Sequence, residues 1–171
     1  GALTECLLER EVRVIAVEID RDLAGLIRGR FGDRITLVEG DCLAKGRRLS
    51  PEAVSALEGA EFKLVANLPY QAASPLMASL LMQHPECSGQ WVTIQKEVVD
   101  RLVANPGTKA WGPLTAIVRA FASARRIALL PPGCFWPAPK VTSAMAELVP
   151  CASDSRPSDP DGFARFVTKL L

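Results

Sequence analysis

The sequence predicts a mixed α/β fold built on a doubly wound, largely parallel sheet. Short apolar runs typical of buried strands alternate with amphipathic helical stretches over the first two thirds of the chain. Polar residues follow several of these runs directly, at the strand ends where open α/β sheets bind ligands. With 171 residues, 49% of them hydrophobic and 23% charged, the chain can form one domain with a sizeable core.

The elements follow from apolar periodicity, since runs of four to six apolar residues predict strands and apolar residues three or four apart predict helices. The expected helices span residues 2–10, 21–30, 51–57, 74–81, 96–103 and 114–122, and the expected strands span residues 12–17, 35–38, 62–66, 90–95, 125–130 and 143–149. In the first helix, Leu3, Leu7 and Leu8 share one stripe. Ser50 followed by Pro51 is typical of a helix start.

A proline-rich loop precedes the last expected strand. Residues 131–139 contain four prolines and a glycine, which removes backbone donors and predicts a stiff loop that presents Phe135 and Trp136. Residues 151–162 read as a polar linker, and residues 163–171 as a short amphipathic stretch. We therefore expect a domain over residues 1–150, followed over residues 151–171 by a linker and the beginning of a helical domain.

The first expected element is a helix, whereas a nucleotide-binding α/β unit begins with a strand and a glycine-rich turn. Gly1 is placed as the last glycine of such a turn would be. The sequence is thus expected to be a fragment that lacks the first strand of its sheet.

Composition argues against several classes of protein and site. No apolar run approaches the roughly 20 residues that span a bilayer, and the first residues lack the basic start of a signal peptide, so a soluble cytoplasmic protein is expected. The five cysteines are scattered without a Cys-x-x-Cys pair, which predicts reduced thiols. His84 is the only histidine, so a Ser-His-Asp triad or a metal site is poorly supported, and no metal is expected.

Charge is distributed unevenly along the chain. Residues 1–85 carry ten Lys and Arg against twelve Asp and Glu, whereas residues 86–171 carry ten against seven. Between residues 96 and 145 the count is seven basic to two acidic. This segment can contact phosphates, although a solvated basic face would give the same count.

Three polar residues lie at or shortly after the ends of expected strands. The carboxylate of Glu18 is suited to ribose hydroxyls, and Asp41 is suited to the amine of a nucleobase, which together describe an adenosine-containing cofactor. Either acid can instead cap a helix, and Glu18 alone is equally compatible with NAD. Asn67 follows the strand at residues 62–66 and begins the stretch Asn67-Leu68-Pro69-Tyr70.

This stretch offers an amide, a backbone carbonyl without a sheet partner and an aromatic ring at one strand end. Asn67, Leu68 and Tyr70 together can hold a planar ring that bears an exocyclic amine. In the alternative interpretation, Asn67 caps the helix that begins near Ser74 and Tyr70 only packs.

Asn67-Leu68-Pro69-Tyr70 resembles the fourth signature motif of the ribosomal RNA adenine N6-dimethyltransferases, the KsgA/Dim1 group, to which the Erm methyltransferases are related. Further matches follow in order along the chain: Gly1-Ala2-Leu3-Thr4, Val17-Glu18-Ile19-Asp20, Gly40-Asp41-Cys42, Gln95-Lys96-Glu97-Val98 with Arg101, Pro106-Gly107-Thr108-Lys109, and residues 135–143 from Phe135 through Lys140. The last two favour the KsgA/Dim1 branch over the Erm branch.

The resemblance implies a class I S-adenosylmethionine-dependent methyltransferase with a Rossmann-like sheet, which dimethylates N6 of adenines in small-subunit (16S) ribosomal RNA during ribosome biogenesis. It implies catalytic roles for Asn67, Leu68, Pro69 and Tyr70, cofactor contacts from Gly1, Leu3, Glu18, Ile19, Asp41, Cys42 and Asn67, and RNA contacts from Tyr70, Phe135, Lys96, Arg101, Lys109 and Lys140. The partner would be the immature small ribosomal subunit, and the protein would act as a monomer. As a fragment, this chain is expected to bind cofactor weakly or to be inactive.

Other functions remain open from the sequence. A non-enzymatic RNA-binding assembly factor on the same fold has no need of an amine-orienting turn at Asn67. An Erm-like methyltransferase would act on 23S ribosomal RNA instead. An NAD-dependent oxidoreductase would leave the loop around Phe135 unexplained.

Overall fold

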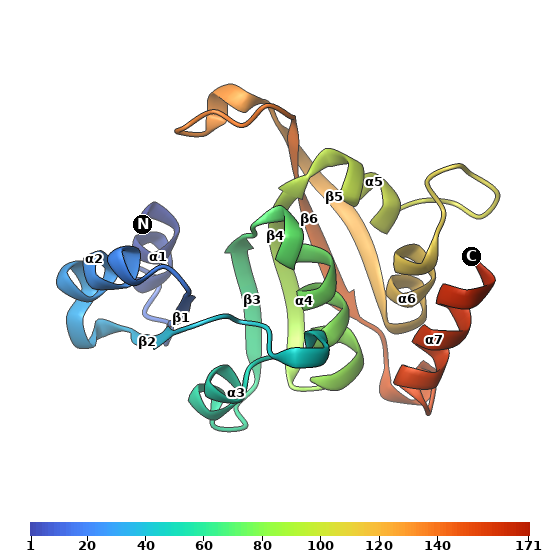
Figure 1. Ribbon diagram of the computed structural model, residues 1–171, viewed down its shortest axis with the longest axis horizontal. Coiled ribbons are helices and arrows are strands. Elements are labelled where there is room, and N and C mark those ends of the chain that lie inside the picture. The colour runs from blue at the N-terminus through green and yellow to red at the C-terminus, as the bar shows by residue number, and fades with distance from the viewer. The chain divides into compact units, whose positions relative to one another are not determined.

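The structure is a computed structural model that describes residues 1–171, except for the burial of Gly46. The chain divides into two compact units, residues 1–60 and 61–171 (Figure 1). The first unit contains α1 (Ala2–Leu8), β1 (Ile15–Glu18), α2 (Arg21–Phe31), β2 (Thr36–Glu39) and α3 (Pro51–Leu57), with short 3-10 turns at Gly32–Arg34 and Lys45–Arg47. The second contains β3 (Phe62–Asn67), α4 (Tyr70–Gln83), β4 (Cys87–Gln95), α5 (Lys96–Leu102), α6 (Pro113–Phe121), β5 (Ala122–Leu130), β6 (Ser143–Pro150) and α7 (Pro160–Leu170), with 3-10 turns at Pro132–Cys134 and Ser153–Ser155.

In the first unit, β1 and β2 form a parallel two-stranded sheet in which Glu18 pairs with Glu39. Asp20 caps α2 by accepting the N–H groups of Asp22 and Leu23, a contact worth about 1 kcal/mol. Arg30 at the end of α2 donates to the Glu5 carboxylate of α1. The Arg30–Glu5 ion pair links α2 to α1 within the unit.

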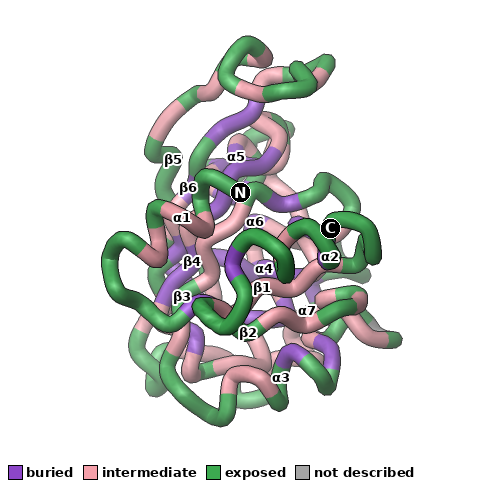
Figure 2. Tube along the Cα trace, turned by 90° about the vertical axis from the view of Figure 1, so that its left-hand side faces the viewer, coloured by how far each residue is buried: buried purple, intermediate pink, exposed green. Residues whose placement is uncertain are grey.

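In the second unit the strand order is β3-β4-β6-β5, with β3 parallel to β4 and the other pairs antiparallel. One face of this sheet carries the core, because alternate residues of β4 and β6 are fully buried there (Figure 2). The buried side chains of the strands and of helices α4, α5 and α6 include Val92, Ile94, Ala144, Leu148, Met77, Leu80, Val99 and Phe121. Full burial of each larger apolar side chain stabilises the fold by roughly 1.5–3 kcal/mol.

The other face of the four-stranded sheet carries a polar row across the strands. Trp91 of β4 donates its indole N–H to Glu147 of β6 at 3.0 Å, and Arg125 of β5 pairs with the other oxygen of Glu147. Lys63 of β3 lies over the Trp91 ring at 5.7 Å. Gly89 leaves room for this ring, since a Cβ there would come within 2.6 Å of it.

Mixed α/β structure with parallel strand pairs is confirmed, and several boundaries differ from the expected ones. Each unit contains one sheet with a parallel strand pair, β1-β2 in the first unit and β3-β4 in the second. The first strand begins at Ile15 instead of residue 12, and β5 begins at Ala122 instead of residue 125. The absent first strand of the sheet stays a prediction.

The last helix is longer than expected and packs within the second unit. It begins at Pro160, with Asp159 as its cap, and Phe163 makes an edge-on ring contact with Phe121 of α6 at 6.1 Å. The beginning of a separate helical domain within residues 151–171 stays a prediction. Among the described residues, no helix is long and apolar enough to cross a membrane, and no three His, Cys, Asp or Glu side chains are grouped as metal ligands.

Candidate functional site

Glu18 and Asp41 lie at the same edge of the two-stranded sheet. Glu18 is the last residue of β1, and its carbonyl accepts the N–H of Gly40 at 2.9 Å, directly after β2. Gly40 has a φ of +151°, which side-chain-bearing residues rarely adopt, so glycine makes this turn possible. The structure thus brings both predicted acids to one strand edge.

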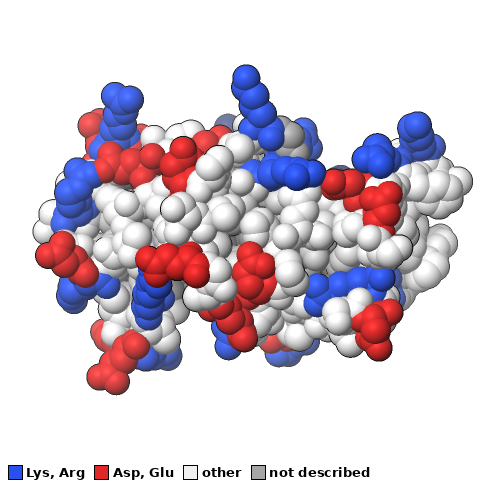
Figure 3. Space-filling model, turned by 90° about the horizontal axis from the view of Figure 1, so that it is seen from below, with Lys and Arg blue, Asp and Glu red and all other residues white. Residues whose placement is uncertain are grey.

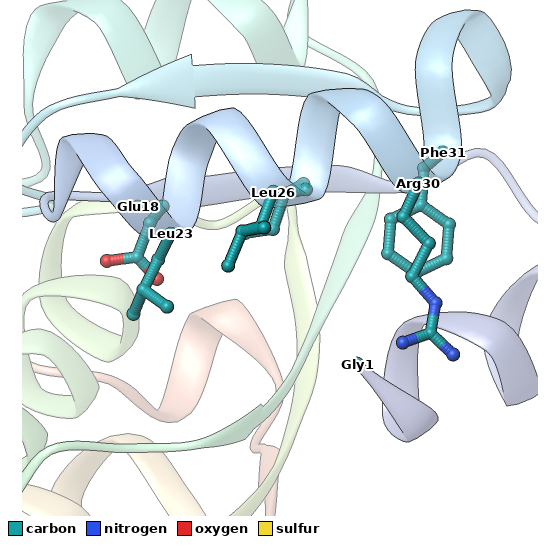
Figure 4. A pocket seen from close by; sticks show the side chains of 7 residues that line it. Gly1, Glu18, Leu23, Leu26, Arg30 and Phe31 are labelled. Carbon is teal, nitrogen blue, oxygen red and sulfur yellow. The ribbon is translucent and has the colours of Figure 1, made fainter.

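The Glu18 side chain is only partly engaged by the protein. One of its oxygens accepts the N–H of Asp20 at 2.9 Å, while Asp20 itself caps α2, so Glu18 is not a helix cap. Its second oxygen has no partner among the described residues. Glu18 lines an open hollow of about 250 Å³, beside Leu23 and along the apolar side of α2 that includes Leu26 (Figure 4).

Asp41 borders a different hollow, of about 400 Å³, between the end of β2 and the start of α3. One oxygen accepts the N–H of Leu43 at 2.9 Å, so Asp41 stabilises its own turn and is not a helix cap either. Burial raises the pKa of the neighbouring Cys42 thiol above its ordinary value of 9.0, and the Asp41 charge adds to the rise. Cys42 is therefore an uncharged thiol at neutral pH.

The other predicted cofactor residues of this unit are less closely grouped. Gly1 immediately precedes α1 and lines the hollow of Glu18. Leu3 is 43% exposed and Ile19 is 66% exposed, and neither lines either hollow. An adenosine-containing cofactor needs acceptors for ribose hydroxyls and for a base amine, and the unengaged oxygen of Glu18 and the carboxylate of Asp41 are of this kind.

In the second unit, Asn67 ends β3 and Tyr70 begins α4, so the predicted four-residue motif joins a strand to a helix. Asn67 is exposed, and Leu68 is buried, with its N–H donated to the Thr93 carbonyl of β4 at 3.1 Å. Among the described residues, neither the Asn67 side chain nor the Leu68 carbonyl has a hydrogen-bond partner. Two acceptors are therefore available next to each other at the strand end.

Helix α4 begins four residues earlier than expected, and the interpretation of Asn67 as its cap is wrong. Pro69 occupies the cap position, without a side-chain hydrogen bond. The carbonyl of Pro69 accepts the N–H groups of Ala72 and Ala73, which starts the helix at Tyr70. The Tyr70 side chain is 41% exposed.

The residues predicted to contact RNA come from several elements of the second unit. Lys96 is the first residue of α5, directly after β4, and its N–H donates to the Thr142 carbonyl at 3.0 Å. Arg101 is exposed in α5, and Lys109 and Lys140 are exposed in loops. On the face seen in Figure 3, basic and acidic side chains are interspersed.

Phe135 and Trp136 lie in the proline-rich loop, which extends beyond the ends of β5 and β6 (Figure 1). Phe135 is half-buried, whereas Trp136 is 97% exposed. The loop therefore presents Trp136 to solvent as expected, and Phe135 only in part.

Comparison with known proteins adds a family match over the whole chain. The family profile described as "Ribosomal RNA adenine dimethylase" matches residues 1–171. "Ribosomal RNA small subunit methyltransferase A" from Anaeromyxobacter dehalogenans (strain 2CP-C) is 42% identical over 97% of this chain, and its namesake from Cupriavidus pinatubonensis is 41% identical over 88%. The chain spans only 59% and 52% of these two relatives.

Two solved structures are similar in fold. A dimethyladenosine transferase from Plasmodium falciparum has a TM-score of 0.74 and 26% identity, covering 91% of this chain and 54% of that protein. The 23S rRNA methyltransferase ErmE has a TM-score of 0.67 over 92% of this chain and 59% of that protein, and at 21% identity it is informative on fold alone. Both neighbours share the class I S-adenosylmethionine-dependent methyltransferase fold.

Proposed function

Because the chain belongs to the ribosomal RNA adenine dimethylase family, we propose that it transfers methyl groups from S-adenosylmethionine to N6 of adenines in small-subunit ribosomal RNA, twice on each target base. It would act as a monomer in the cytoplasm, on immature small subunits. The observation that carries this proposal is the pair of unpartnered acceptors, the Asn67 side chain and the Leu68 carbonyl, at the carboxyl end of β3.

These acceptors suit the chemistry of the target. The lone pair of an adenine N6 is delocalised into the ring, so the amine is a weak nucleophile. The two N–H groups of the amine would donate hydrogen bonds to the Asn67 side-chain oxygen and to the Leu68 carbonyl. These hydrogen bonds would favour a pyramidal amine with its lone pair directed at the methyl group. Catalysis would then depend on orientation and electrostatics instead of on a strong base.

The base must leave its stack before it can be methylated. Tyr70, at the start of α4, and Phe135, from the proline-rich loop, are suited to hold it between aromatic rings, and Pro69 fixes the backbone between the acceptors and Tyr70. Lys96, Arg101, Lys109 and Lys140 would contact the RNA backbone. Stacking of this kind is worth roughly 1–3 kcal/mol per base.

The cofactor supplies the methyl group. The ribose hydroxyls would donate hydrogen bonds to the unengaged oxygen of Glu18, and the adenine amine would donate to the carboxylate of Asp41. Gly1, Leu3, Ile19 and Cys42 would contribute the surrounding backbone and apolar surface.

The decisive experiment is transfer of labelled methyl groups to immature small subunits, followed by nucleoside analysis of the RNA. Because the chain spans 59% of a close relative, the assay is run on this chain and on a chimera carrying the flanking segments of the Anaeromyxobacter dehalogenans protein. We expect N6,N6-dimethyladenosine from the chimera and its loss in Asn67→Ala.

Two other outcomes would redirect the proposal. Subunit binding without methylated product in the chimera would support a non-enzymatic assembly factor. Methylation confined to 23S ribosomal RNA would support an Erm-like activity instead.

A further inference from the structure

One carboxylate in the second unit serves two cations from different elements. Asp100 of α5 contacts the Lys96 ammonium at 2.5 Å through one oxygen and the Arg126 guanidinium of β5 at 3.1 Å through the other. The Lys96 and Arg126 side chains are 43% and 42% exposed. This cluster, Lys96, Asp100 and Arg126, carries a net charge of about +1.

The neighbouring arginine in β5, Arg125, differs from Arg126 in its counterion. Arg125 lies on the other face of the sheet, where it has the Glu147 carboxylate as its own partner. Arg126 pairs in register with Ala146, on the side of the sheet that is covered by helices. One of two neighbouring arginines is therefore neutralised, and the other shares its counterion.

The cluster retains donors for a further anion. A lysine ammonium has three N–H donors and a guanidinium has five, and Asp100 engages one on each residue. Asp100 also keeps the two cations close together in spite of their mutual repulsion. A phosphodiester carries one negative charge, which balances the net charge of the cluster.

The cluster lies near the edge of the sheet to which the proposed base-binding residues belong. The end of β4 that precedes Lys96 is parallel and adjacent to the end of β3 at Asn67. The Lys96 N–H binds Thr142, two residues after Lys140 and at the base of the loop that carries Phe135. The position therefore suits a phosphate close to the target base.

We propose that Lys96 and Arg126, held together by Asp100, bind a single backbone phosphate of the substrate RNA, which makes Arg126 an RNA contact and Asp100 a positioning residue. This inference rests on the proposed function, because it takes RNA as the ligand. It adds Arg126 to the RNA contacts, gives Asp100 a positioning role, and assigns Lys96 and Arg126 to one phosphate.

The test measures binding of a fluorescently labelled, adenine-rich single-stranded RNA by anisotropy over a series of KCl concentrations. For single strands the slope of log K against log [salt] changes by about 0.7 for each phosphate contact. Arg126→Gln should weaken binding about tenfold at low salt and lower the slope by up to about 0.7. Arg126→Lys should keep most of the slope.

The neighbouring Arg125→Gln is the matched control, since it removes the same charge one residue away on the opposite face. Its slope should equal that of the parent protein. Equal slopes for Arg126→Gln and Arg125→Gln would overturn the proposal. The double variant Lys96→Gln with Arg126→Gln tests whether the two residues share one phosphate. A change of about 0.7 in the slope of log K against log [salt], relative to the parent, indicates one shared phosphate. A change of about 1.4 indicates two separate phosphates and contradicts the proposal.

Methyl transfer by the chimera is measured separately with the same variants. Product formation together with an unchanged KM for RNA in Arg126→Gln would reject the phosphate site and leave the methyltransferase proposal intact. If Arg126→Gln reduces the salt slope but the parent chimera forms no methylated product, the phosphate site is supported and the methyltransferase proposal is rejected. An Asp100→Asn variant that keeps the fold but raises KM for RNA, with kcat unchanged, supports the positioning role.

Discussion

The exposed amide of Asn67 and the carbonyl of Leu68 are polar groups without protein partners at a strand end. If they orient the target amine, Asn67→Ala should lower kcat by about two to three orders of magnitude, as loss of a preorganised transition-state contact does elsewhere. Binding of S-adenosylmethionine, measured by calorimetry, should change far less. Asn67→Asp keeps an acceptor oxygen and should retain more activity, and equal losses in kcat and cofactor affinity in Asn67→Ala would contradict this role.

Phe135 is half-buried, so it can stack on the target base or anchor its own loop. Phe135→Ala should lower kcat/KM for RNA by a factor between about 5 and about 160, the equivalent of 1–3 kcal/mol of stacking. Phe135→Leu separates the two roles, because leucine can anchor a loop but cannot stack as an aromatic ring does. Full recovery of kcat/KM in Phe135→Leu would assign Phe135 to the anchor.

Single residues were predicted unevenly from the sequence. Glu18, Asp41 and Asn67 could be placed at strand ends because the apolar runs before them are clear. Arg126 was missed as a distinct site, although alternation along a strand already assigns Arg125 and Arg126 to opposite faces. Its link to Asp100 depends on the packing of α5 against β5, which no local pattern encodes.

The predicted boundaries of helices and strands were wrong where tertiary contacts or proline determine the boundary. Helix α4 starts at Tyr70 because Pro69 can occupy a cap position, whereas the sequence pattern alone marks Pro69 only as the end of a strand. Strand β5 starts at Ala122 because it pairs there with Pro150, a partner that is remote in sequence. The start of α7 was predictable, since Asp159 and Pro160 form the same kind of signal as Ser50 and Pro51.

The polar row on the four-stranded sheet makes stability depend on pH. The hydrogen bond from Arg125, together with its charge and the Trp91 N–H, holds the pKa of Glu147 below its ordinary value of 4.5. The unfolded chain therefore binds this proton more tightly than the folded one. Its contribution to stability is present above about pH 4.5 and is lost as the pH falls through the folded-state pKa.

Urea unfolding at a series of pH values checks this expectation. Glu147→Gln should be less stable than the parent at neutral pH, and its stability should fall less steeply on acidification. Glu61→Gln removes an exposed glutamate that precedes β3 and serves as the control. A parallel acid dependence in Glu147→Gln and the parent would show that the row contributes nothing to pH sensitivity.

At the scale of the whole molecule, the alternation of strands and helices predicted the fold class, while the division at residue 60 was not predicted. Local patterns report which segments are strands, but the strands that pair are chosen by long-range contacts. The predicted site residues fall in both units, with Glu18 and Asp41 in the first and Asn67 in the second.

Binding of the cofactor should stabilise the folded chain as a whole. At a hundredfold excess over Kd the gain is about 2.7 kcal/mol, or a rise in Tm of about 5–10 °C for a chain of this size. Glu18→Gln should abolish most of this rise in thermal unfolding of the chimera, whereas Asp22→Asn, an exposed acid in the first turn of α2, should leave it unchanged. The same rise in Glu18→Gln and in the parent would remove Glu18 from the cofactor site.

The 97% exposure of Trp136 gives the proline-rich loop its own optical signal. Trp91 and Trp111 are both partly buried, so a neutral water-borne quencher such as acrylamide should reach them less readily than it reaches Trp136. Emission from Trp136 should be red-shifted and readily quenched. Occupancy of this loop can therefore be followed in solution by tryptophan fluorescence, without an attached dye.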